Sequence, residues 1–143
     1  MTITHKRSNL QEGFSLIEIM VAVLIMGILA AVVGAGTTAY LRRAAVNSTT
    51  ASLNALSQAL DMYKSDTGYY PKSLEELVEA PKGAQGKKWQ GPYLSKAKTP
   101  QDGWKHDFYY KVTPGAKHPY DLHSYGPNGE ESPEEEHLSV WEI

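Results

Sequence analysis

A single carboxylate lies within the most apolar stretch of this 143-residue chain. Residues 14–33 form a run of 20 whose only charged side chain is Glu18. As a helix rising 1.5 Å per residue, the run is about 30 Å long, which matches the hydrocarbon core of a bilayer. An acid inside a membrane-spanning helix costs roughly 2.5–3.5 kcal/mol on insertion scales, so it usually has a partner and a function. The sequence therefore predicts a membrane-spanning helix in which Glu18 has a specific role.

Other interpretations of the apolar run fit less well. A secretory signal peptide would have an apolar core of only about 7–15 residues, followed by a cleavage site. A simple signal anchor fits the length but leaves Glu18 unexplained. A buried core helix would be apolar on one stripe, whereas this segment is apolar all round. The basic residues Lys6 and Arg7 favour a cytoplasmic leader, with the remainder of the chain outside.

Glu18 has no Lys or Arg partner within the apolar run. Cleavage of the chain between Gly13 and Phe14 would create an α-amino group one helical turn from Glu18, in the same chain or in a neighbouring copy. In a low-dielectric setting, this ammonium group would attract the carboxylate of an adjacent helix and set the register between the two. We therefore interpret Glu18 as an assembly residue.

The stretch GFSLIEIMVAVLIMGILAAVV, which begins at Gly13, resembles the class III signal of type IV pilins and pseudopilins. In that signal, Gly is followed by Phe, and Glu comes four residues after the Phe. The resemblance implies cleavage after Gly13 by a prepilin peptidase, N-methylation of Phe14, and a filament drawn out of the inner membrane. It divides the chain into a leader (1–13), a transmembrane and filament-core helix (14–35) and a periplasmic globular domain (36–143).

The helical pattern continues beyond the apolar run into an amphipathic segment. Apolar residues recur there at spacings of three and four, which is typical of one buried helix face. The pattern ends at Gly68, with Pro71 beyond it. We therefore predict one helix from Phe14 to about Asp66, whose second half packs against a small domain. The residues of the apolar face are Leu53, Leu56, Leu60 and Tyr63.

The rest of the chain predicts a small α+β domain. Ser73 and Glu76 have the spacing of a capping box, which predicts a two-turn helix ending before Pro81. Residues 82–93 have the composition of a loop. Two aromatic-rich segments, 107–112 and 120–126, are separated by a Pro-Gly turn and predict an antiparallel pair of strands on the helix.

The order of motifs after the helix resembles that of the major pseudopilins of the type II secretion system. The motifs are a Gly-x-Tyr-Pro exit from the helix at 68–71, a Pro-x-Asp-x-Trp turn formed by Pro100, Asp102 and Trp104, and a Ser-x-Gly-Pro-x-Gly loop at 124–129. The resemblance covers essentially the whole chain. It implies a type IV pilin-like fold, in which a long amino-terminal helix packs against a small antiparallel sheet with a carboxy-terminal loop.

This resemblance also implies a function and partners. The chain would be a structural subunit that polymerises in the periplasm and drives export of folded proteins across the outer membrane. Its partners would be further copies of itself, minor pseudopilins, the inner-membrane assembly platform, the prepilin peptidase and the outer-membrane secretin system. One alternative is a type IV pilin used in adhesion or motility, although many of those carry a disulfide loop that a chain without cysteine cannot form. Another is a periplasmic enzyme or binding domain on an uncut signal anchor.

The carboxy-terminal stretch GPNGEESPEEEHLSVWEI contains six glutamates and no Lys or Arg. Such a run is often a solvated tail, but the apolar residues after it favour a loop that packs back on the domain. Calcium binds six to eight oxygen ligands and would neutralise the loop. Major pseudopilins hold a calcium ion here, mostly through aspartates and main-chain carbonyls, so Asn and Glu imply altered geometry or loss of the ion. The matching positions are Asn128, Glu135 and Glu136, with the carbonyls of Tyr125 and Glu130.

Composition excludes several other classes of function. A formal net charge of −2 argues against nucleic acid as a partner, because phosphate binding needs a basic surface. Without cysteine the chain has no thiol nucleophile and no thiolate metal site. The five histidines have no metal-ligand spacing such as H-E-x-x-H, and no nucleophile elbow or phosphate loop is present. We therefore predict that the chain is not an enzyme.

Overall fold

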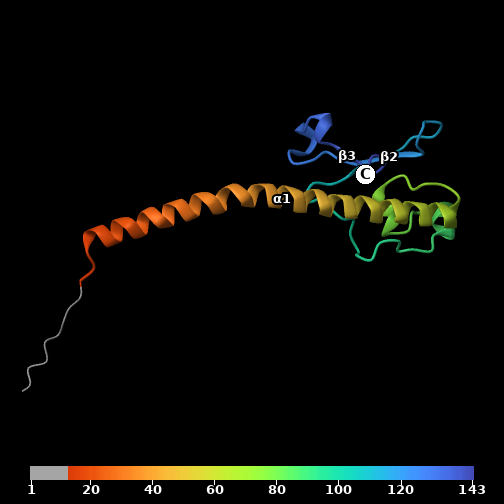
Figure 1. The fold of residues 1–143 in the computed structure, drawn as a ribbon. Helices are drawn as coiled ribbons and strands as arrows, with labels where there is room; N and C mark the ends of the chain where they lie inside the picture. Colours follow the sequence, from red (N-terminus) through yellow and green to blue (C-terminus); the bar gives the residue numbers. More distant parts are fainter. Residues whose placement is uncertain (1–12) are drawn as a thin grey trace, which may run out of the picture. The chain divides into compact units, whose positions relative to one another are not determined.

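The computed structural model describes residues 13–143, apart from the side chain of Ala35. The predicted leader, 1–13, therefore lies outside the described residues except for Gly13. The chain divides into two compact units, one ending at Tyr40 and the other formed by Leu41–Ile143. Figure 1 shows the elements of both units.

Helix α1 runs from Leu16 to Thr67, and this confirms the long helix expected from the sequence. Up to Tyr40, its large apolar side chains are exposed, and it is the one described helix long and apolar enough to cross a membrane. The helix ends where Gly68 adopts φ +90°, a left-handed conformation that glycine tolerates without steric cost. The N–H of Gly68 closes the last turn on the carbonyl of Lys64 at 2.8 Å.

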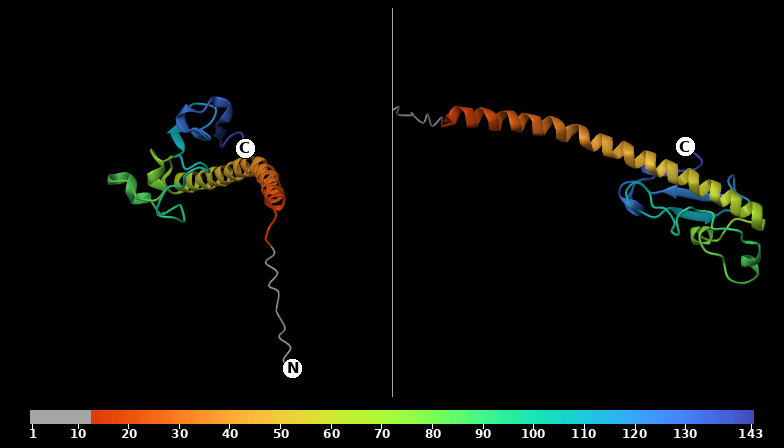
Figure 2. Two further views of the ribbon diagram at one scale, coloured as in Figure 1. Left: turned by 90° about the vertical axis from the view of Figure 1, so that its left-hand side faces the viewer. Right: turned by 90° about the horizontal axis from the view of Figure 1, so that it is seen from below.

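The second unit builds its core on one face of the α1 residues from Leu41 onward. The four apolar residues predicted for this face are all fully buried, and Tyr120 and Leu122 of the sheet are buried with them. The sheet has the order β1-β2-β3 and is antiparallel, with strands Tyr109–Val112, Tyr120–Ser124 and Leu138–Ser139. Figure 2 shows this sheet lying along the carboxyl half of α1. Strand β3 was not predicted, since a two-residue strand has no periodicity to detect.

The segment between helix and sheet corrects two local expectations. Instead of a two-turn capped helix there is a 3₁₀ turn, η1 (Leu74–Leu77), and the Ser73 side chain forms no capping hydrogen bond. Glu76 does not reach back to Ser73, because its carboxylate accepts a 2.7 Å hydrogen bond from the Tyr63 hydroxyl. A second 3₁₀ helix, η2 (Gly83–Lys88), lies where a loop was expected. In both places contacts with neighbouring segments outweigh the local pattern.

Candidate assembly and metal sites

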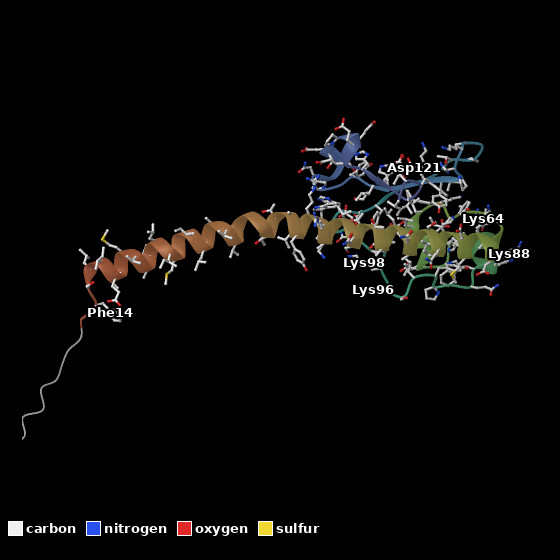
Figure 3. The ribbon with its side chains drawn as sticks, viewed as in Figure 1. Phe14, Lys64, Lys88, Lys96, Lys98 and Asp121 are labelled. Atoms are coloured by element: carbon white, nitrogen blue, oxygen red, sulfur yellow. The ribbon has the colours of Figure 1, made fainter. Side chains whose placement is uncertain are left out.

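The predicted cleavage bond lies in exposed, non-helical chain. Gly13 and Phe14 precede α1, and Phe14, labelled in Figure 3, is 80% exposed. Ser15 caps the helix: its Oγ accepts the N–H of Glu18 at 3.3 Å, and its carbonyl accepts the same N–H at 3.1 Å. Because the backbone of residues 13 and 14 is not part of the helix, a peptidase can reach it without unwinding a turn.

Glu18 also has a local role at the start of α1 that was not predicted from the sequence. It is the third residue after the Ser15 cap, in the first turn of α1, and Ser15-x-x-Glu18 is a capping-box spacing. A carboxylate there gains roughly 0.3–1 kcal/mol from the helix dipole. That gain is smaller than the roughly 2.5–3.5 kcal/mol that an acid costs inside a membrane. Glu18 also forms no ion pair with another described residue. Within one chain, therefore, neither helix capping nor an ion pair offsets the cost of this carboxylate in a membrane.

The unit that ends at Tyr40 presents an apolar surface on every side. Its large apolar side chains between Phe14 and Val33 are 45–80% exposed. A continuous exposed surface of this kind marks contact with lipid or with another protein. Both coverings are consistent with a helix that passes from a membrane into a bundle of like helices.

In the second unit, the predicted Pro-x-Asp-x-Trp turn is fixed by a buried carboxylate. Asp102 is 3% exposed, and its Oδ1 accepts the backbone N–H groups of Trp104 at 2.9 Å and His106 at 2.8 Å. Gly103 joins the turn to α1, because its N–H donates to the Thr49 hydroxyl at 2.9 Å. This motif is therefore structural: it attaches the loop to the helix.

The residues expected to bind calcium all lie in the turn region after β2, which includes the 3₁₀ turns η3 (Gly129–Glu131) and η4 (Glu134–Glu136). The side chains of Asn128, Glu130 and Glu135 are exposed, whereas that of Glu136 is partly buried. Glu136 Oε1 lies 3.6 Å from the Arg42 guanidinium, and Glu136 Oε2 is buried without a hydrogen-bond partner. A buried carboxylate oxygen without a donor is costly, and a cation would relieve this cost.

The main chain of the same turn offers further oxygens. The carbonyl of Glu130 cannot close a 3₁₀ bond three residues ahead, because Pro133 has no N–H. Within residues 13–143, three or more His, Cys, Asp or Glu side chains do not come together as a metal cluster. The donors here are one orphan carboxylate oxygen, exposed carboxylates, an amide and carbonyls. All of these are oxygen ligands, which calcium prefers, whereas zinc prefers nitrogen and sulfur ligands.

Two family models match the chain. The prokaryotic N-terminal methylation motif matches residues 8–34. The model described as type II secretion system (T2SS), protein G, matches residues 37–142. The chain belongs to the type II secretion system protein G family.

Similar proteins agree with the family over nearly the whole chain. The type II secretion system core protein G of Pseudomonas aeruginosa is 44% identical over 126 residues, which cover 85% of this chain and 87% of that protein. The core protein G of Escherichia coli is 38% identical and covers 95% of this chain and 94% of that protein. A solved major pseudopilin from the type 2 secretion system of enterohaemorrhagic Escherichia coli matches with a TM-score of 0.55 at 28% identity, over 71% of this chain and 90% of that one.

Membership of the protein G family confirms the predicted fold and favours the pseudopilin over the type IV pilin. The solved relative is a major pseudopilin, and the long helix with its small antiparallel sheet is the architecture expected for that class. The matched motif at residues 8–34 spans Gly13, Phe14 and Glu18. The residues on which the assembly hypothesis depends therefore lie within the matched methylation motif.

Proposed function

We propose that this chain is a structural subunit that polymerises into the pseudopilus of a type II secretion system and has no catalytic activity. One observation supports the proposal most strongly: an exposed, all-round apolar helix carries one carboxylate, Glu18, directly after an accessible Gly13–Phe14 bond. Burial of apolar surface is worth roughly 25 cal/mol per Å², so packing among like helices stabilises a polymer strongly. Burial is not directional, so Glu18 supplies the register.

In this proposal the leader, 1–13, is removed by a prepilin peptidase, and the new amino group of Phe14 is N-methylated. The terminal amine remains cationic after methylation. It then pairs with the Glu18 carboxylate of an adjoining copy, which offsets the cost of burying both charges. Before assembly, residues 14–35 span the inner membrane, and residues 36–143 lie in the periplasm. The expected partners are other copies, minor pseudopilins, the inner-membrane assembly platform and the outer-membrane secretin system.

We also propose a calcium ion in the turn that follows β2. The supporting observation is Glu136 Oε2, which is buried without a partner although Arg42 lies beside the other oxygen of the same carboxylate. The residues that would hold the ion are Asn128, Glu135 and Glu136 through side chains, and Tyr125 and Glu130 through carbonyls. The ion would supply positive charge to an acidic turn and fix it to the domain. With no cysteine in the chain, no disulfide can do this.

Mass spectrometry of the membrane-bound protein tests the proposal. We expect the mature chain to begin at Phe14 and to carry one methyl group on its amino terminus. A chain that keeps Met1 in cells with an active prepilin peptidase would contradict the proposal and would favour a domain on a signal anchor. The variant Gly13→Ala provides the matched control. A Cβ at Gly13 meets no atom of residues 13–143 within 4 Å, so any loss of cleavage reports recognition rather than folding.

A further inference from the structure

The outer face of the sheet carries an open hollow of about 380 Å³. Three carboxylates line it: Asp121 on β2, Glu134 on η4 and Glu142 near the carboxyl end. Tyr109 and Tyr125 form part of its wall. None of these carboxylates belongs to the proposed calcium ligands. The hollow therefore keeps its negative charge when that ion is bound.

Aromatic contacts hold the wall of the hollow in place. Tyr109 stacks on His123 with ring centroids 4.7 Å apart, and His123 stacks on His137 at 5.3 Å with the rings nearly parallel. His123 Nδ1 lies 2.9 Å from Asp121 Oδ1, which fixes that carboxylate on the face of the sheet. Carboxylates beside aromatic rings suit an ammonium group, since the charge is attracted by both.

Lysines dominate a different part of the same unit. Residues 82–98 contain five lysines and no acidic residue, and all five are exposed. Two of them, Lys87 and Lys88, are adjacent at the end of η2. Within the described residues, no lysine of this segment forms an ion pair. Their charges are available to a partner.

The Lys87–Lys88 pair and the turn that carries Glu134 lie at opposite ends of the α1 portion within the unit Leu41–Ile143. Glu136, in the same 3₁₀ turn as Glu134, contacts Arg42 near the start of this portion. The carbonyl of Gln85, in η2, accepts a hydrogen bond from Tyr69, just beyond the end of α1. From residue 42 to residue 67 a helix rises about 37 Å. Figure 3 shows Lys88 near the carboxyl end of α1 and Asp121 on the sheet.

We propose that the hollow binds the Lys87–Lys88 pair of a second copy of this chain. Complementary patches at different places on one molecule make a heterologous contact, and repetition of such a contact builds a helical filament. Asp121 is already paired with His123, and Lys111 stands opposite it in the strand register. Glu134 and Glu142, which form no ion pair with a described residue, are therefore the carboxylates free for an incoming cation. The proposal rests on the proposed polymerisation, to which it adds a contact between globular units.

Cysteine crosslinking of the full chain in cells tests this contact, because the native chain has no cysteine. Two variants, Lys88→Cys and Glu134→Cys, are expressed together and oxidised mildly. We expect a disulfide-linked dimer in the polymer, and its loss when both chains also carry Glu18→Ala. The matched control replaces Lys88→Cys by Lys105→Cys, an exposed lysine next to the Asp102 turn at the other end of the unit. If the polymer is normal but the two cysteine pairs crosslink equally, or neither crosslinks, the proposed contact is wrong. The proposed polymerisation would not be affected by that result.

Charge reversal gives an independent measurement. We expect Lys87→Glu with Lys88→Glu to lower the polymerised fraction roughly two- to fivefold, as does Glu134→Lys with Glu142→Lys. The combination of all four changes restores it, whereas Lys105→Glu has no effect. If the combined variant is as defective as the two doubles together, the proposal is wrong. Loss of secretion with a normal polymer would instead assign the hollow to a secreted protein, and failure of the unaltered chain to polymerise would reject the proposed function as well.

Discussion

Ser124 on β2 donates a 2.6 Å hydrogen bond to Asp102 Oδ2 in the buried interior of the second unit. The other oxygen of the same carboxylate accepts two backbone N–H groups, so one side chain joins the central strand to the turn that lies on α1. The Asp102 side chain is fully buried. The packing of the sheet against the helix therefore depends on the hydrogen bonds that this carboxylate accepts.

Asp102→Asn tests that dependence. The amide nitrogen cannot accept the hydrogen bond from Ser124, so we expect the free energy of unfolding to fall by about 1–3 kcal/mol. Urea unfolding of the full chain in detergent micelles, followed by circular dichroism, measures it. Asp107→Asn is the matched control, because Asp107 is exposed and bonds only the Gln101 side chain. Equal effects of the two substitutions would contradict the structural role of Asp102.

Gly103→Ala tests the close approach of the same turn to α1. A Cβ on Gly103 would clash with the carbonyl oxygen of Ala45, which is backbone and cannot move aside. We expect a loss of about 1–3 kcal/mol in stability, as for other overpacked sites. Gly115→Ala provides a comparison in which backbone strain occurs without a clash, since Gly115 has φ +84° and open space around it. A smaller loss at Gly103 than at Gly115 would show that the contact is loose.

Alkaline pH should destabilise the second unit through its buried tyrosines. Burial, followed by the nearby Glu76, raises the pKa of Tyr63 above its ordinary value of 10.0, and burial likewise raises the pKa of Tyr110. The folded state therefore favours the neutral phenol of each tyrosine. The stability that these two neutral phenols contribute is complete below pH 10 and is lost as pH rises from there toward the folded-state pKa values. Stability measured between pH 8 and pH 12 should fall less steeply for Tyr63→Phe than for the control Tyr40→Phe, whose side chain is 72% exposed. Identical slopes would contradict the assignment.

Calcium should raise the melting temperature of the full chain. At one hundred times its dissociation constant, an ion that binds only the folded state adds about 2.7 kcal/mol. We expect chelation to remove this gain and Glu136→Gln to abolish the response to calcium. Glu79→Gln should preserve the response, because Glu79 is an exposed residue that follows η1 and is not among the proposed ligands. Magnesium serves as the ionic-strength control. An unchanged melting curve with calcium would reject the ion.

Much of the fold could be predicted from the sequence because long periodic patterns dominate it. The apolar stripe of Leu53, Leu56, Leu60 and Tyr63 recurs over several turns, and each of these side chains is fully buried in the structure. Short elements could not be predicted in the same way. At Ser73 the capping pattern is present, but Tyr63, far along the chain from Glu76, takes the carboxylate that the cap needs.

The candidate sites divide similarly. Gly13, Phe14 and Glu18 were predicted from a local motif, and in the structure α1 begins at Leu16, shortly after the predicted cleavage bond. The capping role of Ser15 was not predicted, because the apolar residues around it dominate the sequence pattern. The Ser-x-x-Glu spacing of a capping box is nevertheless present and could have indicated it. Arg42 could not be connected with Glu136 from the sequence, because nothing local relates two residues 94 positions apart; only the folded domain brings them to 3.6 Å.

The most direct test of the account is the polymerised fraction of Glu18→Ala in cells, measured with exoprotein release and with Ser15→Ala as control. We predict that Glu18→Ala is inserted, cleaved and folded but does not polymerise or support secretion. Ser15→Ala should polymerise normally, because it alters the helix cap and keeps the charge. Normal polymer from Glu18→Ala, or an equal defect in Ser15→Ala, would contradict the claim that the Glu18 carboxylate sets the register between subunits.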